Sequence, residues 1–499
     1  MTEISIPSRL NELVLETASG FVVVTEWDPT DFADDEIKNH FDDFAGITTS
    51  EGGLDSLAQQ SIDALYNLIV NFRSLSDENR ELFAQSLTEL SAQAIETIGE
   101  QLSVQKRNAR KQVIYFLIEF LKINEEVARE ENNEVEKVAL QKGTKAPPKA
   151  KAKKADSSYS WLEWRQCCLN LIFQAVCSEP SYLWNMGVVE ENFLRGMWSS
   201  SLSILEYKPK GVGGAGIPES KIRGLCVAII TRCSALFGTA AGGGLGALSS
   251  ALLDSIIRAE HMANFCAEIC NKSQATLCRD VLLSVSHLTF TGHSGSGGEK
   301  NIGTFIESLA KINPDLMCQH LATLKTQIDS PAHQIRSSLL IAMGMVISNI
   351  HKVSEELAGR GDLLTQKEAE KKVVDGDDES DNVNNDDEDN QKEKEVEKEV
   401  DSAASEKNIA QLSRLRDSLL DLLTERTHDV SYFTRANVLK VFICVLFLYF
   451  LSYFLFKHLS DIFLLFFFYK HFFFVILVVF TYLFFFFRLP ISVFLGFFF

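Results

Sequence analysis

Two stretches of the sequence carry the same helical pattern, and this pattern limits the fold more than any other feature. Residues 301–350 and 411–441 each contain an Asp, a short turn, and a helix with an early Arg and apolar residues at three- and four-residue spacing. The two pairs are Asp329 with Arg336 and Asp429 with Arg435. Such helices stack on one another because no single pair buries its apolar face alone. The pattern predicts an all-α solenoid, an architecture typical of scaffolds.

The spacing of the two stretches fits a known repeat length. Asp329 and Asp429 lie about 100 residues apart, and an insertion of about 55 residues (351–406) separates them. Without the insertion the separation is about 45 residues, within the range of roughly 40–47 residues for HEAT-type repeats. In such a repeat we expect the Asp to cap the second helix and the Arg to continue a ladder of contacts between adjacent repeats.

Acidic charge is concentrated in one segment. The 499-residue chain has a formal net charge of -19, and residues 375–401 contain 14 acidic side chains against three Lys. The overall charge argues against a generally basic nucleic-acid-binding protein but leaves room for a basic groove on one face. This tract and the Lys/Ala/Pro segment 142–154 have little to bury, so both are predicted to be disordered. The Lys-rich segment fits either a phosphate-contacting or nuclear-import segment or a solvated linker.

No residue is predicted to be catalytic, cofactor-binding or metal-ligating. The ten Cys lack the spacing of a disulfide framework and the amino end lacks a signal-peptide pattern, so reduced thiols in an intracellular protein are expected. Gly211–Gly216 matches GxGxxG, but Pro209 and Pro218 beside it favour a loop over a nucleotide site. Gly242–Gly246 lacks the Lys-Ser/Thr of a phosphate-binding loop and is interpreted as a turn.

Cysteine and histidine clusters are interpreted as core or solvated residues. His261, Cys266, Cys270 and Cys278 lack the short CxxC spacing of zinc sites, and free Cys on a helix behaves as a small apolar residue. The pair Cys167-Cys168 is interpreted in the same way. The remaining candidates, which are expected on helices or at their ends, are His287, His320 and His333. An enzyme is therefore not predicted.

The last sixty residues differ from the rest. From Val441 to Phe499 there are one acidic and three basic residues and 21 of the 36 Phe. Val441–Phe456 and His471–Phe487 approach the ~20 apolar residues that cross a bilayer, which is one interpretation, a membrane anchor. The interpretation that we favour is a translated intron, because Phe, Leu, Ile, Val, Tyr and Ser all have T-rich codons.

The sequence divides into seven segments. They are an N-terminal region (1–50), a helical N-terminal domain (51–141), a Lys/Pro-rich disordered linker (142–158), HEAT-like helical repeats (159–352), a disordered acidic insertion (353–408), a further HEAT-like repeat (409–441) and a Phe-rich hydrophobic tail (442–499). Within the second segment, Ser76 is expected to cap a helix whose apolar residues recur at the amphipathic period.

Three segments resemble a known family, the HEAT-repeat non-SMC regulatory subunit 1 of condensin. They are residues 301–344, from Asn301-Ile-Gly-Thr-Phe to Met343-Gly344; residues 422–441, from Leu422-Leu-Thr-Glu-Arg to Lys440-Val441; and residues 252–261, Leu-Leu-Asp-Ser-Ile-Ile-Arg-Ala-Glu-His. The likeness covers about residues 50–441, the amino-terminal part of a longer family protein. It stops at Val441, where the family continues with further repeats.

The resemblance implies a scaffold without catalytic activity or cofactor. Its partners would be the kleisin subunit, the SMC ATPase subunits and DNA, during mitotic chromosome condensation. Its place would be the nucleus and the chromosomes, with a cytoplasmic pool. A hypothesis of a different class is a membrane-anchored helical adaptor tethered by residues 441–499.

Sequencing of the mature transcript separates the two hypotheses. We expect the Phe-rich codons after Val441 to be absent from it, because their composition fits a T-rich non-coding stretch. Reads across the codons for residues 438–450 provide the measurement. Retention of these codons in the spliced message would favour the membrane-anchored adaptor instead.

Overall fold

The structure is a computed structural model, and it forms two compact units, residues 1–342 and 343–499. The described residues are 4–15, 23–27, 34–50, 53–55, 57–96, 102–141, 159–184, 189–207, 220–237, 244–290, 297–374 and 409–457. The predicted linker 142–158, the segment Gly211–Gly216, the acidic tract from residue 375 and the tail from residue 458 lie outside them.

Unit 1 consists of helices that follow one another in chain order. They are α1 (Asp34–Thr49), α2 (Gln59–Val70), α3 (Asp77–Glu96), α4 (Val104–Gln141), α5 (Trp161–Cys177), α6 (Pro180–Leu183), α7 (Glu191–Glu206), α8 (Ser220–Phe237), α9 (Gly244–Arg258), α10 (Glu260–Lys272), α11 (Ala275–Ser286), α12 (Gly297–Ile312), α13 (Pro314–His320) and the start of α14 (His333–Val374). Short 3-10 helices lie between some of them: η1 (Leu10–Val14), η3 (Gly53–Asp55), η4 (Phe72–Ser74) and η6 (Leu321–Asp329).

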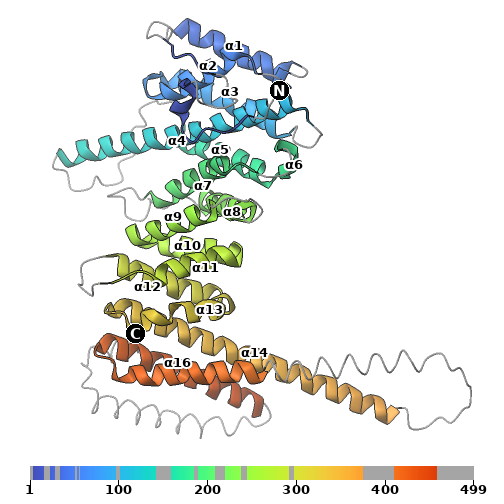
Figure 1. The fold of residues 1–499 in the computed structure, drawn as a ribbon, viewed down its shortest axis with the longest axis vertical. Helices are drawn as coiled ribbons and strands as arrows, with labels where there is room; N and C mark the ends of the chain where they lie inside the picture. Colours follow the sequence, from blue (N-terminus) through green and yellow to red (C-terminus); the bar gives the residue numbers. More distant parts are fainter. Residues whose placement is uncertain are drawn as a thin grey trace, which may run out of the picture. The chain divides into compact units, whose positions relative to one another are not determined.

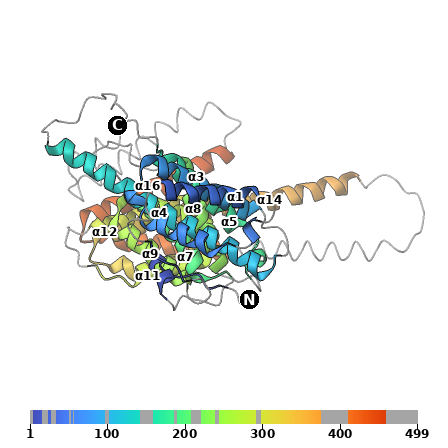
Figure 2. The same cartoon turned by 90° about the horizontal axis from the view of Figure 1, so that it is seen from above.

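The helices of unit 1 stack as the sequence predicts. Each packs mainly on helices one to three places away in the chain: α3 on α4, α4 on α5 and α7, α7 on α8, α9 on α11 and α12, and α10 on α12. Figure 1 shows this succession, and in Figure 2 the helices of unit 1 lie over one another in projection. No described residue is assigned to a β-strand. The predicted all-α, HEAT-like fold is confirmed.

Local signals set two helix starts in unit 1. Ser76 Oγ accepts a hydrogen bond from the backbone N–H of Asn79 at 3.3 Å, so the predicted cap before α3 is confirmed. Asn313 Oδ1 accepts from the N–H of Leu316 at 2.9 Å, and Pro314 occupies the first position of α13. Proline is favoured there because the first helical N–H groups have no intrahelical partner.

Aromatic side chains join the two sides of the 142–158 gap. The ring of Phe120 on α4 meets Phe72 and Phe83 edge-on, with ring centroids 5.3 and 5.5 Å apart. The ring centroid of Tyr159 lies 5.8 Å from that of Phe72 and 4.6 Å from that of Trp161, the first residue of α5. Edge-to-face contacts of this kind stabilise by about 0.5–1.5 kcal/mol beyond area burial. The chain on both sides of the gap therefore belongs to one core.

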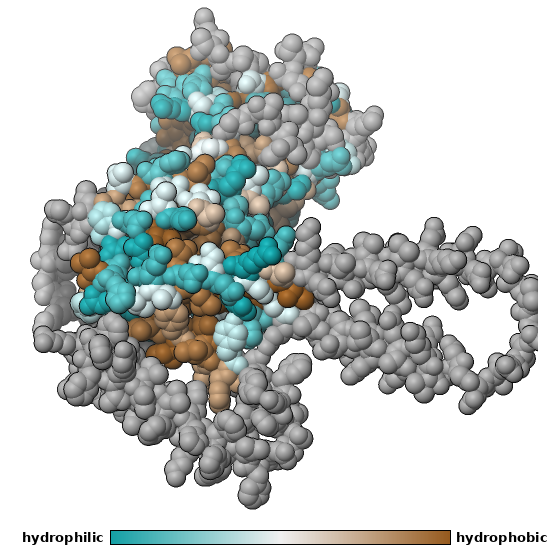
Figure 3. All heavy atoms as spheres, turned by 60° about the horizontal axis from the view of Figure 1, so that its bottom comes forward, coloured by the Kyte–Doolittle hydropathy of each residue, from teal (hydrophilic) through white to brown (hydrophobic). Residues whose placement is uncertain are grey.

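Unit 2 comprises α14 from residue 343 on, helical residues 409–425, η7 (Arg426–His428) and α16 (Tyr432–Lys457). One face of α16 is buried through Thr434, Val438, Val441 and Val445. Exposed apolar side chains of α16 are Tyr432, Phe433, Leu446 and Phe447. Figure 3, which brings the lower part of Figure 1 forward, shows apolar atoms at the surface.

Two expected boundaries fall inside helices. Helix α14 continues to Val374, beyond the boundary placed at residue 352, and α16 continues to Lys457, beyond the boundary placed at Val441. Val445 is buried in the same stripe as Val441, so the helical period runs across the change in composition. Within the described ranges, no helix combines the length and the apolar composition needed to span a membrane.

Substitution of Gly344 tests the close crossing of α14 and α16 in unit 2. A Cβ at this position would lie 2.4 Å from Cγ1 of Val441, a side chain with little rotamer freedom. We expect Gly344→Ala to lower the free energy of unfolding by about 1–2 kcal/mol, because overpacking outweighs the gain in helix propensity. Urea denaturation followed by circular dichroism measures it.

Gly224→Ala is the matched control. No atom lies within 4 Å of a Cβ built at Gly224 in α8, so only the propensity gain of about 1 kcal/mol remains. Equal destabilisation by both substitutions would contradict the close contact.

Candidate functional site

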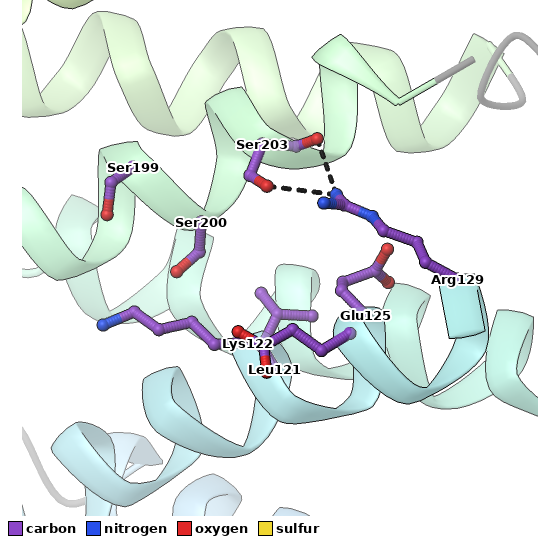
Figure 4. A pocket seen from close by; sticks show the side chains of 8 residues that line it. Leu121, Lys122, Glu125, Arg129, Ser199, Ser200 and Ser203 are labelled. Atoms are coloured by element: carbon purple, nitrogen blue, oxygen red, sulfur yellow. Dashed lines mark hydrogen bonds between the residues drawn. The ribbon is translucent and has the colours of Figure 1, made fainter.

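A polar pocket of about 230 Å³ lies between α4 and α7, within unit 1. Its lining residues are Leu121, Lys122, Glu125, Glu126 and Arg129 of α4 and Ser199, Ser200 and Ser203 of α7. They recur at helical spacing, so each helix presents one polar face to the other. Figure 4 shows these side chains around the hollow, with Lys122 extending away from Arg129.

Most charged side chains around the pocket form ion pairs with other residues of the chain. Glu125, whose side chain is 6% exposed, binds the guanidinium of Arg165 on α5 through both carboxylate oxygens, with Nη2 to Oε2 at 2.9 Å. Lys122 Nζ lies 2.5 Å from Oε1 of Glu119. At the surface, Oε2 of Glu126 lies 3.2 Å from Nη2 of Arg73. The bidentate pair connects α4 to α5, so we assign it a structural role.

Arg129 makes its contacts with neutral groups. Its Nη2 donates to the carbonyl of Ser203 at 2.7 Å and to the hydroxyl of the same residue at 3.0 Å (Figure 4). Its Cζ lies 4.9 Å from the ring centroid of Tyr207, within range of a cation–π interaction. Ser200 Oγ donates to the carbonyl of Gly196 at 2.7 Å. The lining residues include no His or Cys.

The structure places the predicted Cys cluster in the core of unit 1. Cys266, Cys270 and Cys278 are buried, as is Cys168, whereas Cys167 is half-buried; all ten Cys are free thiols. Burial raises the pKa of Cys266, and a hydrogen bond with Cys278 together with burial raises the pKa of Cys270. Thiols in this state are inert, because the thiolate is the reactive form.

The four His considered in the sequence, His261, His287, His320 and His333, do not come together in one site. His261 Nε2 lies 3.1 Å from the carbonyl of Leu205. His287 follows α11, and His320 and His333 stand at the last position of α13 and the first of α14. In the described part of the chain, no group of three or more His, Cys, Asp or Glu could hold a metal ion.

The second Gly-rich segment becomes helical partway through. Helix α9 begins at Gly244, inside the turn expected at Gly242–Gly246. A Cβ at Gly244 would lie 2.2 Å from the ring of Phe237, so this position requires glycine for packing.

The two repeat arginines bind the turns that precede their own helices. Arg336 Nη1 donates to the carbonyls of Ser330 and Pro331, at 2.5 and 3.1 Å. Arg435 Nη1 donates to the carbonyls of Asp429 and Val430, at 2.6 and 3.1 Å. A ladder of arginine contacts to the adjacent repeat is predicted from the sequence, whereas these bonds lie within the repeat.

A side-chain oxygen closes the turn before each of the two helices, from Asp429 before α16 and from Ser330 before α14. Asp429 Oδ1 accepts from the N–H of Ser431 at 2.8 Å, which closes the turn before α16. In the first repeat, Ser330 Oγ accepts from the N–H of Ala332 at 3.3 Å. Identical spacing of the Arg bonds in both units supports a shared repeat, whose side chains stabilise the turn before the second helix.

Comparison with known proteins gives two matches. Residues 59–231 match the family described as non-SMC mitotic condensation complex subunit 1, N-term. Condensin complex subunit 1 of Xenopus laevis is 22% identical over 458 residues, which cover 88% of this chain and 28% of that protein. The chain therefore spans less than a third of the length of this relative. The resemblance found in the sequence is confirmed, and the family match includes both helices of the polar pocket.

Substitution of Glu125 tests the structural role of the pocket. Glu125→Gln leaves Arg165, which is 17% exposed, without its carboxylate. We expect the free energy of unfolding to fall by about 2–3 kcal/mol, somewhat below the range of about 3–5 kcal/mol for breaking a fully buried pair. Glu126→Gln is the control, because its pair with Arg73 is half exposed on both sides and contributes less than about 1 kcal/mol. Equal effects in urea denaturation would refute the assignment.

Proposed function

We propose that this chain, whose two matches support its place in the condensin subunit 1 family, is a non-catalytic helical scaffold of a condensin-like complex. The observation that carries the proposal is the family match over residues 59–231, which falls on the stacked helices α2 to α8. The paired charges of the pocket and the buried thiols fit a protein that binds rather than transforms its partners.

The proposed partners are the kleisin subunit and the SMC ATPase subunits, which would hydrolyse the ATP. Stacked helix pairs support this role because each repeat adds surface without a new core, and such surfaces bind extended segments of other proteins. The proposed setting is mitotic chromosome condensation, in the nucleus and on chromosomes, with a pool in the cytoplasm.

DNA is a further proposed partner. The six Lys between residues 142 and 154 supply the charge for phosphate contacts, which weaken as salt rises. The membrane-anchored adaptor rests on the composition of residues 442–499 alone.

Co-purification tests the scaffold proposal. The full chain is co-expressed with the kleisin and SMC subunits of the same organism's condensin, and a tag on the kleisin is used for purification. We expect the chain to elute with the complex in stoichiometric amount. The control replaces the kleisin with that of a different SMC complex. Equal recovery with both kleisins, or recovery with neither, would count against the proposal.

The same complex tests the DNA contact. Replacement of the six Lys by Gln is expected to weaken DNA binding and to flatten the slope of log affinity against log salt. An unchanged slope would remove DNA contact from the role of this segment.

A further inference from the structure

An extended segment of the chain lies along one face of α2. Gln59, Asp63 and Asn67 stand at four-residue spacing on this helix, and they bind the backbone of residues 23–27. The bonds are Gln59 Nε2 to the carbonyl of Val23 (2.9 Å), Thr25 N–H to Asp63 Oδ1 (3.2 Å), Asn67 Nδ2 to the carbonyl of Thr25 (2.8 Å) and Trp27 N–H to Asn67 Oδ1 (3.0 Å). We call the three side chains the α2 ladder.

The α2 ladder recognises backbone because two repeat distances nearly coincide. Four residues of an α-helix rise about 6.0 Å, and two residues of an extended chain span about 6.6 Å. Every fourth side chain of the helix therefore meets every second residue of the bound segment. Since Asn67 binds a carbonyl and an N–H of the main chain, its contacts do not depend on the side chains of that segment.

Two side chains of the bound segment add selectivity. Val24 is 3% exposed, and its N–H donates to the carbonyl of Leu13 at 2.9 Å. The ring of Trp27 stacks on His40 of α1, with centroids 4.7 Å apart and an interplanar angle of 21°. Val23 is 43% exposed and Thr25 is also exposed. The aliphatic Val24 and, three positions later, the aromatic Trp27 are therefore the side chains of this segment that contact the rest of the fold.

The bound segment covers the α2 ladder at Asn67. With residues 23–27 in place, Asn67 is 2% exposed, and its amide oxygen accepts the Trp27 N–H. Release of the segment exchanges these hydrogen bonds for bonds to water, so another extended chain that restores them can take its place. Gln59 Nε2 also donates to Asp63 Oδ1 at 2.7 Å, which holds the neighbouring side chains in place.

We propose that the α2 ladder is a peptide-binding site that residues 23–27 occupy in cis, and that it binds in their place an extended partner segment. This segment carries an aliphatic residue followed three positions later by tryptophan or another large aromatic residue. The bound cis segment then acts as a competitor that sets the affinity for the partner. The proposal is independent of the assembly proposed above, because it concerns contacts within α1, α2 and the amino-terminal segment.

A displacement experiment with the full chain tests the site. The probe is a fluorescein-labelled synthetic peptide with the sequence of Phe21–Pro29, and fluorescence anisotropy measures its binding. The double variant Val24→Asp/Trp27→Ala releases the cis segment, and we expect it to bind the probe at least tenfold more tightly than the wild-type chain does. Addition of Asn67→Ala to this variant is expected to reverse the gain.

The matched control is the same peptide with a methyl group on the amide nitrogen of Trp27. It keeps every side chain but lacks the donor to Asn67 Oδ1, so we expect at least tenfold weaker binding. Equal binding of the two peptides, or equal affinity of the released variant and the wild-type chain, would overturn the proposal.

Circular dichroism shows whether the double variant folds. If it does not, a milder variant tests the same displacement. Thr25→Pro removes only the N–H that bonds Asp63, and proline fits extended backbone. We expect several-fold tighter binding of the probe, and unchanged affinity in this folded variant would refute the displacement. A wild-type dimer by light scattering that dissociates in Trp27→Ala would assign residues 23–27 to a second copy and overturn the cis arrangement.

Discussion

The first half of unit 1 depends on the burial of helix α4. Residues 113–118, 120 and 121 of this helix are all buried, and α4 packs on α2, α3, α5, α6 and α7. A helix that is apolar around its whole circumference is stable only when neighbours cover every side. Its polar residues must then find partners inside the protein. This explains the binding of Glu125 to Arg165, and of the Tyr159 hydroxyl to Asn124 Oδ1 at 2.7 Å.

Close approach between helices follows from the same demand for burial. Gly196 of α7 faces Ile118 of α4, where a Cβ would lie 3.2 Å from a methyl carbon. Gly303 of α12 faces Ser338 of α14, whose hydroxyl donates to Glu307 Oε1 at 2.5 Å. Because each helix touches only near neighbours in the chain, the stability of such a stack is approximately a sum of local terms.

Local periodicity made much of this fold predictable, and contacts over long sequence separations were not. The cap at Ser76 and the apolar setting of Cys266 follow from residues within one or two turns. In contrast, Asn67 reads as an ordinary polar residue in an apolar helix, because its partners lie about 40 residues earlier. The pocket between α4 and α7 is hidden from sequence for the same reason. The partners of Arg336 are local but depend on turn geometry that spacing does not reveal.

The two periods that meet on α2 differ by about 0.6 Å per step. Over the two steps from Gln59 to Asn67 the mismatch grows to about 1.2 Å, which bent hydrogen bonds and flexible side chains absorb. A third and fourth step would push donors and acceptors out of register. One helix of this kind can therefore bind the backbone of only about five residues of extended chain in register. A longer ligand would need a second helix to bind its remaining residues.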